Sequence, residues 1–427
     1  MNESRIVWVK IGGLWPLHTG GRLRSFHIVS ELSRRHRVTV LTTHRPGEDP
    51  AALAAQLPHC ERVVSFPHAA PKQASWRFVG SVARSWLSPL PVDLWKSRVP
   101  AVHAEVDRLL GGGRVDVCVA DFLVAAPNVR LGGAVPVVLF AHNVEHMIWK
   151  RLATVETRAW RRALLEVEWR KMRRCEARAC TQATVTIAVS DVDRALLAAA
   201  APGARVFTVP TGVDTSYFAP AGVPESPAGL VFIGSMDWYP NEDAMVFFIG
   251  EILPVIRRAV PDVEMTVVGR DPSERLRALG EAAGVRITGT VEDVRPWVAD
   301  AAVYVVPLRV GGGTRLKIFE GLAMGKAVVS TTVGAEGLPL VDGTHFVRAD
   351  GPAEFARAVV SLLRDRDRRR ALGTAGRHLV EARYSWATVA REFETRCEPA
   401  LVARVSADAR PRVDRGLSRV SPPFSHR

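Results

Sequence analysis

Short apolar runs alternate with longer amphipathic stretches along most of this chain. The runs Val135–Phe140 and Ala302–Val306 contain no charged residue, as expected for strands that are covered by helices on both faces. Stretches of helical length, such as Glu242–Ala259, follow the runs. This alternation predicts parallel sheets with helices on both faces. Because it occurs twice within 427 residues, we predict an α/β protein with two doubly wound domains.

The boundary between the two blocks falls in a segment rich in Pro and Gly, VPTGVDTSYFAPAGVPESPAG, at residues 209–229. We therefore place the first domain at residues 1–212 and the second at residues 213–385. Residues 404–427 contain Pro, Arg and Ser but few apolar residues, which predicts a basic disordered tail. Between Pro46 and Pro100 the pattern is mixed, and we assign no elements there.

The composition excludes several classes of protein. With 47% hydrophobic and 24% charged residues, the chain is not predominantly disordered. No apolar run approaches the ~20 residues that span a bilayer, and the N-terminus lacks the pattern of a signal peptide. We therefore expect a cytoplasmic protein. The five Cys residues are dispersed without C-x₂-C spacing, so we expect neither a zinc site nor a disulfide framework.

The net charge of +13 is unevenly distributed. Residues Lys150–Arg178, most of them in a predicted helix, contain ten Lys or Arg and four Glu. No aromatic residues alternate with the bases, so we expect no nucleic-acid partner. Anionic substrates or an anionic membrane surface fit the charge better. We expect peripheral contact with the inner face of a membrane, and the alternative is a solvated Arg-rich helix.

The strongest local signal is the sequence VGGGTRLKIFE, which follows the apolar run Ala302–Val306 and opens a helix. Glycines allow close approach of the backbone, and the free N–H groups of a helix start suit a diphosphate. Arg315 could add a bidentate contact, and Lys317 and Glu320 share one helix face. The alternative is a tight turn with a surface ion pair. We expect this phosphate-bearing ligand to be contacted in the same loop by four further residues, Gly311, Gly312, Gly313 and Thr314.

Two weaker signals follow strands of the first block. Gly20 and Gly21 open a helix after the first strand, which is compatible with an anion. The sequence is not G-x-G-x-x-G, so a nicotinamide site is disfavoured. His142 directly follows the strand Val135–Phe140, where it could exchange a proton or bind a hydroxyl. The alternative for Gly20 and Gly21 is a simple surface turn. The alternative for His142 is a hydrogen-bonded loop residue.

A third weaker signal, GSMDWYPNEDA, follows the first strand of the second block. Gly234 and Ser235 begin a turn, and Asn241 is a plausible N-cap of the next helix. We expect these three residues to contact the same ligand as the Gly-rich loop. The alternative is an ordinary helix start with two packed aromatic residues.

Taken in order, these segments resemble the group 1 glycosyltransferases, a large retaining family of the GT-B fold. The resemblance covers about residues 5–400 and rests on VPTGVDTSYFAP, VFIGSMDWYPN, PLRVGGGTRLKIFEGLAMGKAVVST and YSWATVAREFE. It implies two Rossmann-like domains that face a cleft. It also implies a last helix, residues 386–403, that crosses back to the first domain.

The resemblance further implies transfer of a sugar, with retention at the anomeric carbon, from a nucleotide-sugar to a glycan, lipid-linked or small-molecule acceptor. The second domain would bind the donor and the first mainly the acceptor, without a metal or other cofactor. Polysaccharide biosynthesis is the usual setting of this family. Glu320 matches the second Glu of the family's E-x₇-E motif, which hydrogen-bonds the donor ribose. His142 matches the family's His near the reacting sugar, where it would position the donor or acceptor.

The chain departs from the family pattern at several positions. Gly312 stands where the motif has its first Glu, and the usual Arg and Lys of the second domain are replaced around Met236 and Asn241. Because one subset carries GSMDWxPN together with GGGTRLKIxE, these changes look coordinated. We expect Arg315 and Lys317 to supply the missing charge. The predicted catalytic residues are these two and His142.

Two other functions stay open. One is a catalytically inactive protein that binds nucleotide-sugars, which is suggested by the Gly at position 312. The other is a sugar-nucleotide 2-epimerase of the same fold, which would need catalytic carboxylates at the cleft.

Overall fold

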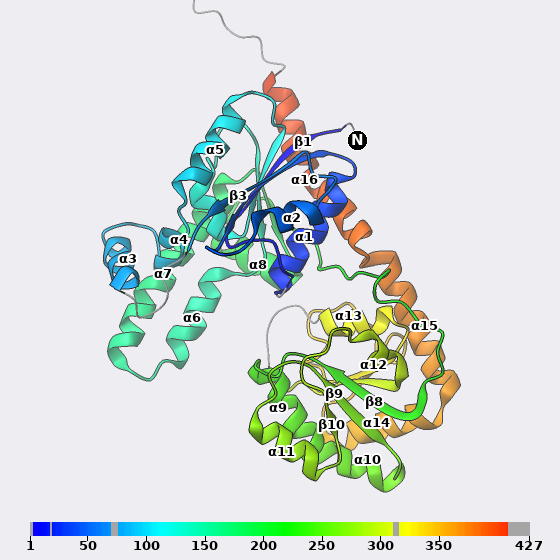
Figure 1. Cartoon of the computed structure of the whole chain (residues 1–427). Coiled ribbons are helices and arrows are strands. Elements are labelled where there is room, and N and C mark those ends of the chain that lie inside the picture. The colour runs from blue at the N-terminus through cyan, green and yellow to red at the C-terminus, as the bar shows by residue number, and fades with distance from the viewer. Residues whose placement is uncertain (1–2, 18, 70–75, 311–315, 409–427) are drawn as a thin grey trace, which may run out of the picture.

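The computed structural model describes residues 3–17, 19–69, 76–310 and 316–408 and contains two α/β units (Figure 1). The first unit has a seven-stranded sheet in the order β3-β2-β1-β4-β5-β6-β7, and the second has a six-stranded sheet in the order β10-β9-β8-β11-β12-β13. Every described strand pair within these sheets is parallel. The predicted class of two doubly wound units is therefore confirmed.

The strands of the first sheet are β1 Arg5–Lys10, β2 Arg37–His44, β3 Arg62–Pro67, β4 Val117–Asp121, β5 Val137–Ala141, β6 Val185–Ala188 and β7 Val206–Thr208. Its helices are α1 Gly20–Ser33, α2 Pro50–Gln56, α3 Trp76–Trp86, α4 Val92–Lys96, α5 Pro100–Gly111, the 3₁₀ helix η1 Leu123–Asn128, α6 Glu145–Val155, α7 Ala159–Gln182 and α8 Asp191–Ala200.

The strands of the second sheet are β8 Ser226–Ile233, β9 Glu264–Val268, β10 Arg286–Ile287, β11 Ala301–Val306, β12 Ala327–Ser330 and β13 Val347–Arg348. The helices that follow β7 in the chain are α9 Tyr239–Phe247, the π-helical turn η2 Phe248–Ile252, α10 Leu253–Ala259, α11 Glu274–Ala282, α12 Arg295–Asp300, α13 Leu316–Ala323, α14 Pro352–Arg364, α15 Arg366–Arg383 and α16 Trp386–Asp408.

The central strands are buried, and this burial accounts for their apolar sequences. Every residue of β4, β5, β11 and β12 is buried, as parallel strands between two helical layers require. Helix α8 is capped by Ser190, whose side chain accepts a hydrogen bond from the backbone N–H of Asp193. Among the described residues, no helix is long and apolar enough to cross a membrane.

Strand order fixes where a ligand can bind. In the first sheet the order reverses between β1 and β4, and in the second it reverses between β8 and β11. The loops that follow two such strands diverge to opposite faces of the sheet and leave a crevice at the carboxyl edge. The residues that directly follow these strands therefore define the two halves of a candidate site.

The chain passes between the units at two neighbouring places. The N–H of Val213 donates to the carbonyl of Tyr384 at 2.7 Å, and Val213 forms a β-bridge with Ser385. Helix α16 then packs against α1 and β6 of the first unit, and Figure 1 shows it lying along that unit. This confirms the predicted helix that crosses back. Helix α16 continues to Asp408 and so includes the first residues of the predicted tail. The rest of that tail lies outside the described residues.

The contact between the two crossings yields a prediction for Gly212. A Cβ atom at this position would lie 2.6 Å from Cε3 of Trp386, so Gly212→Ala should force the indole out of place. We expect a loss of about 1–3 kcal/mol in the free energy of unfolding, measured by urea denaturation. Gly250→Ala is the matched control, because a Cβ there meets nothing within 4 Å. Equal stability of Gly212→Ala and the wild type would contradict this account of the crossing.

Candidate functional site

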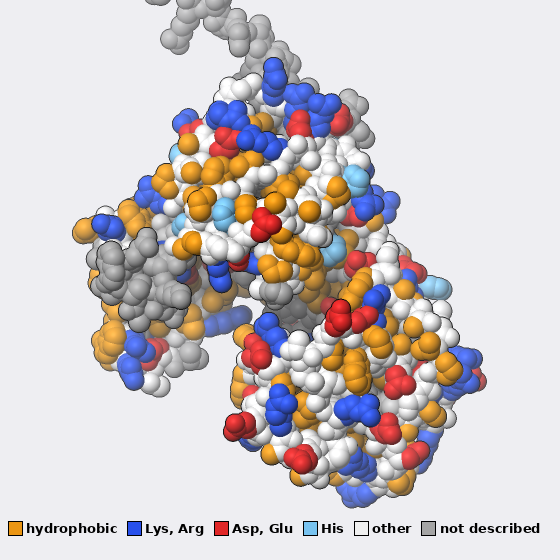
Figure 2. Space-filling view, viewed as in Figure 1, with side chains coloured by type: hydrophobic (Ala, Val, Ile, Leu, Met, Phe, Trp, Pro, Cys, Tyr) orange, Lys and Arg blue, Asp and Glu red, His pale blue; other side chains and the backbone are white. Residues whose placement is uncertain are grey.

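A cleft of about 550 Å³ lies between the two units, and Figure 2 shows the surface hollowed there. It is lined at the carboxyl edges of both sheets, as the strand order requires. The residues that the first unit contributes include Gly20, Gly21, Arg24, Phe122, His142 and Thr211. Those of the second unit include Leu316, Phe319, Glu336, Leu338 and Tyr384.

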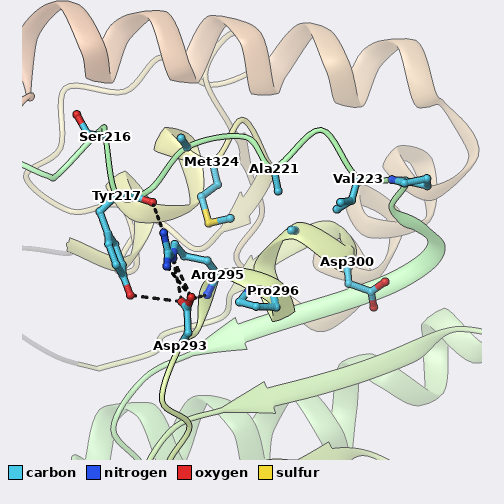
Figure 3. A pocket seen from close by; sticks show the side chains of 12 residues that line it. Ser216, Tyr217, Ala221, Val223, Asp293, Arg295, Pro296, Asp300 and Met324 are labelled. Atoms are coloured by element: carbon cyan, nitrogen blue, oxygen red, sulfur yellow. Dashed lines mark hydrogen bonds and ion pairs between the residues drawn. The ribbon is translucent and has the colours of Figure 1, made fainter.

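A second hollow, of about 590 Å³, lies at the opposite edge of the second sheet (Figure 3). Some of its lining residues lie just before strands: Asp300 directly precedes β11, and Val223 and Pro224 lie shortly before β8. Arg295 bonds both oxygens of Asp293 and lies 3.9 Å from the centre of the Tyr217 ring. Because the hollow faces the amino ends of the strands and these charges pair with each other, we assign the candidate site to the interdomain cleft.

Gly20 and Gly21 lie at the floor of the cleft, at the start of α1. The side chain of Thr19 caps this helix by accepting from the N–H of Arg22. A Cβ on Gly21 would lie 2.5 Å from Cζ of Phe122, and one on Gly20 would lie 3.8 Å from Cδ1 of Leu316 in the second unit. The absence of a side chain at Gly21 therefore leaves room for Phe122, which directly follows β4.

His142 is held inside the floor by two charged neighbours. Its Nε2 lies 2.7 Å from Oδ1 of Asp121, and its Nδ1 lies 2.8 Å from Nη1 of Arg24. Because a guanidinium only donates, Nδ1 must accept and Nε2 must carry the proton. The Phe122 ring stacks on the imidazole at 3.8 Å. Burial lowers the pKa of His142 to about 3, so the ring is neutral at physiological pH.

Sequence reasoning missed the ion network around this histidine. Trp8 Nε1 donates to Asp121 Oδ2 at 2.8 Å, and Lys10 Nζ lies 3.4 Å from the same oxygen. Burial opposes ionisation of Asp121, but Lys10 and His142 outweigh it and lower the pKa of Asp121 to about 2. Lys10 and Asp121 end β1 and β4, so a charged residue at the end of an apolar strand is a signal that could have identified them.

Arg24 links this floor to the segment that leads out of the first unit. Its Nε donates to Oγ1 of Thr211 at 2.8 Å, while its Nη1 contacts His142. Both Arg24 and Thr211 are buried. Neither was identified from the sequence, because the two residues are 187 positions apart and meet only in the fold.

On the second unit, four of the predicted site residues come together at the end of β8. The amide Nδ2 of Asn241 donates to the carbonyl of Ser235 at 2.8 Å, and its Oδ1 accepts from Nζ of Lys317 at 2.6 Å. A Cβ on Gly234 would lie 2.7 Å from Asn241 Nδ2 and 2.8 Å from Lys317 Nζ. The predicted N-cap role of Asn241 is wrong, because α9 begins at Tyr239 and Trp238 occupies the cap position.

Glu320 lies one turn after Lys317 on α13. Burial raises the pKa of its carboxyl to about 7, and the charge of Lys317 opposes this shift. The predicted contacts at Gly311, Gly312, Gly313, Thr314 and Arg315 lie outside the described residues. Among the residues that are described, no three His, Cys, Asp or Glu side chains cluster so as to hold a metal ion.

The raised pKa of Glu320 predicts a pH-dependent effect of Glu320→Gln. Below about pH 5 the wild-type carboxyl is protonated and resembles the amide, but by pH 8 it is charged at a partly buried position. The native state of the wild type should therefore lose stability relative to the variant as pH rises from about 5 to 8, by roughly 2 kcal/mol. Chemical denaturation of the full-length wild type and variant at pH 5 and pH 8 measures this difference in the free energy of unfolding.

The control for this experiment is Glu281→Gln on the exposed side of α11, which should show no such dependence. A difference in stability between Glu320→Gln and the wild type that is the same at pH 5 and pH 8 would contradict the raised pKa of Glu320.

Comparison with known proteins agrees with this geometry. Residues 20–217 match the family model described as Glycosyltransferase Family 4, and residues 227–365 match the model described as Glycosyl transferases group 1. Each half of the chain therefore matches a glycosyltransferase family. The predicted resemblance to group 1 glycosyltransferases is supported at this level.

Curated relatives include mannosyltransferases of mycobacteria. A phosphatidyl-myo-inositol mannosyltransferase from Mycolicibacterium smegmatis is 32% identical over 237 residues, which are 52% of this chain and 60% of that protein. A GDP-mannose-dependent alpha-(1-6)-phosphatidylinositol monomannoside mannosyltransferase from Mycobacterium tuberculosis is 28% identical over 375 residues, which cover 81% of this chain and 89% of that protein. The match to the first of these enzymes thus spans less than two thirds of its length.

Solved structures show the fold. A sucrose-phosphate synthase from Thermosynechococcus elongatus aligns with a TM-score of 0.65 at 15% identity, over 94% of this chain and all of that one. HepE from Anabaena, in complex with UDP and glucose, aligns with a TM-score of 0.61 at 15% identity, over 93% of this chain and all of that one. The chain has the GT-B fold, as predicted.

Proposed function

We propose that this protein is a retaining glycosyltransferase that moves a sugar from a nucleoside-diphosphate sugar to an acceptor. The observation that carries the proposal is the cleft at which the carboxyl edges of both sheets meet. On the second unit the cleft is lined by Leu316 and Phe319 of α13, and Lys317 lies between them in the first turn of this helix. The first unit contributes a floor in which Lys10 lies 3.4 Å from Asp121 and Arg24 contacts His142 and Thr211.

The second unit suits the diphosphate of the donor. In a retaining transfer with an oxocarbenium-like transition state, negative charge builds on the leaving diphosphate, and preset donors stabilise it. Lys317 and the N–H groups at the start of α13 are such donors. We propose that Arg315 and the glycines Gly311–Gly313 extend this site, and that Glu320 accepts hydrogen bonds from the ribose. No metal is needed in this mechanism.

The first unit would bind the acceptor. One nitrogen of His142 contacts Arg24 and the other contacts Asp121. We therefore propose that the imidazole helps to position the donor or acceptor and does not act as a nucleophile. The relatives named above are mannosyltransferases, and one name specifies GDP-mannose. GDP-mannose is therefore the first donor to test, with a lipid-linked or glycan acceptor.

We further propose that α6 and α7 bring the cleft to an anionic membrane. These helices project from the first unit (Figure 1), and Figure 2 shows apolar and basic side chains together on this projection. Trp160 is 61% exposed, and Arg158, Arg161 and Arg162 lie beside it in sequence. Ile148 on α6 is both exposed and part of the cleft lining. A lipid-linked acceptor could thus reach the cleft along α6.

Transfer itself is tested by incubating the protein with GDP-mannose, UDP-glucose or other nucleotide-sugars and a lipid extract, with the product analysed by NMR. We expect an α-linked product from an α-linked donor. Donor binding without transfer to any acceptor would favour the inactive binding protein, and an inverted product would contradict retention.

Replacement of both Arg315 and Lys317 by Ala should lower the rate of transfer at least ~10²-fold, because the leaving diphosphate would lose two cations. Release of nucleoside diphosphate from the donor measures the rate. The control is the double variant Arg258→Ala and Arg275→Ala, which removes two exposed cations from the same unit. Retained transfer in the Arg315 and Lys317 variant would refute their role.

Membrane contact is tested by flotation with vesicles of phosphatidylcholine with and without phosphatidylglycerol. Leu152→Ser combined with Trp160→Ser should weaken binding to the anionic vesicles at least ~10-fold, because a fully buried apolar side chain contributes roughly 1.5–3 kcal/mol. The control is the double variant Val223→Ser and Val341→Ser, because these two side chains are exposed to a similar extent as Leu152 and Trp160. Binding that is unaffected by salt, by phosphatidylglycerol and by the variant would contradict this proposal.

A further inference from the structure

The ammonium group of Lys317 contacts Asn241 and Phe232, which both belong to the described part of the second unit. It donates to Oδ1 of Asn241 at 2.6 Å and lies 4.3 Å from the centre of the Phe232 ring. Asn241 belongs to α9, which follows β8, and Lys317 belongs to α13, which follows β11. The contact therefore bridges the two strand–helix connections at the point where the strand order reverses, which is where ligands of such sheets bind.

The Asn241 amide has one orientation that satisfies both of its ends. Nδ2 donates to the carbonyl oxygen of Ser235, and this leaves Oδ1 turned toward Lys317. The reverse orientation would set the NH₂ group against the ammonium and Oδ1 against a carbonyl, so that neither contact could form. Asn241 is 6% exposed, and the amide is thus held in place by packing as well as by hydrogen bonds.

The backbone at Gly234 is shaped around this pair. A Cβ atom there would lie under 3 Å from both Asn241 Nδ2 and Lys317 Nζ, so any larger residue would displace the pair. The three positions depend on one another although they lie in two segments of the sequence, GSMDWYPN and GTRLKIFE. This physical dependence accounts for the coordinated appearance of the two motifs.

We propose that Asn241 is a positioning residue that holds the Lys317 ammonium at the end of β8 for the phosphates of the donor. This inference rests on the proposed function. A long side chain that is already ordered loses less conformational freedom when it binds an anion than one that is free. The amide also accepts from the ammonium without cancelling its charge, which a carboxylate at position 241 would do.

Two substitutions that keep the number and branching of the side-chain heavy atoms test these contributions, and both also remove the donor to Ser235. Asn241→Leu removes the acceptor and should weaken binding of GDP or UDP, whichever the wild type binds better, about 10-fold. Asn241→Asp keeps the acceptor but neutralises Lys317, and it should weaken binding by at least as much. Binding of the matching nucleoside, guanosine or uridine, should stay within twofold of the wild type in both variants. Calorimetric titration measures all of these affinities, and thermal melting confirms that the variants fold.

The readouts distinguish a positioning role from a structural one. In kinetics, both variants should raise the KM for the nucleotide-sugar, and Glu251→Gln, on an exposed position after α9, should leave it unchanged. Unchanged affinity for the diphosphate, or an equal loss for diphosphate and nucleoside, would overturn the role of Asn241 while the proposed function stands. A wild-type protein that binds no nucleoside diphosphate would overturn both.

Discussion

The hydrogen bond between the Val213 N–H and the Tyr384 carbonyl joins the two places where the chain passes between its units. The cleft depends on this connection, because each unit alone contributes only one of the two sheet edges that line it. With both crossings side by side and α16 packed on the first unit, the two carboxyl edges line one cleft. The close fit of Gly212 against Trp386 shows how little space the joint leaves.

The two faces of the cleft hold their cations with different partners. In the first unit, Lys10 lies against Asp121, and Arg24 contacts the neutral His142 and Thr211; this buried network stabilises the floor. In the second unit, Lys317 donates to a neutral amide and lies over an aromatic ring. This difference fits an anionic diphosphate in the second unit and an acceptor in the first, as we propose.

The sequence predicted the buried strands well and the contacts between distant segments poorly, for physical reasons. Strands such as β5 are covered on both faces and therefore read as apolar runs. Strand β3 was missed because it lies at the edge of its sheet and is only partly buried. The contact between Asn241 and Lys317 depends on the order of β8 and β11, which no local pattern encodes. The Gly-rich loop at 311–315 stays a prediction.

The most direct test of this account is a calorimetric titration of the wild-type protein with UDP, GDP, ADP, dTDP and CMP, with and without Mg²⁺. We predict that one nucleoside diphosphate binds clearly more tightly than the others, with an affinity that Mg²⁺ does not change. That result would support a nucleoside-diphosphate site that requires no metal ion. Failure of all five to bind would contradict a donor site in this cleft.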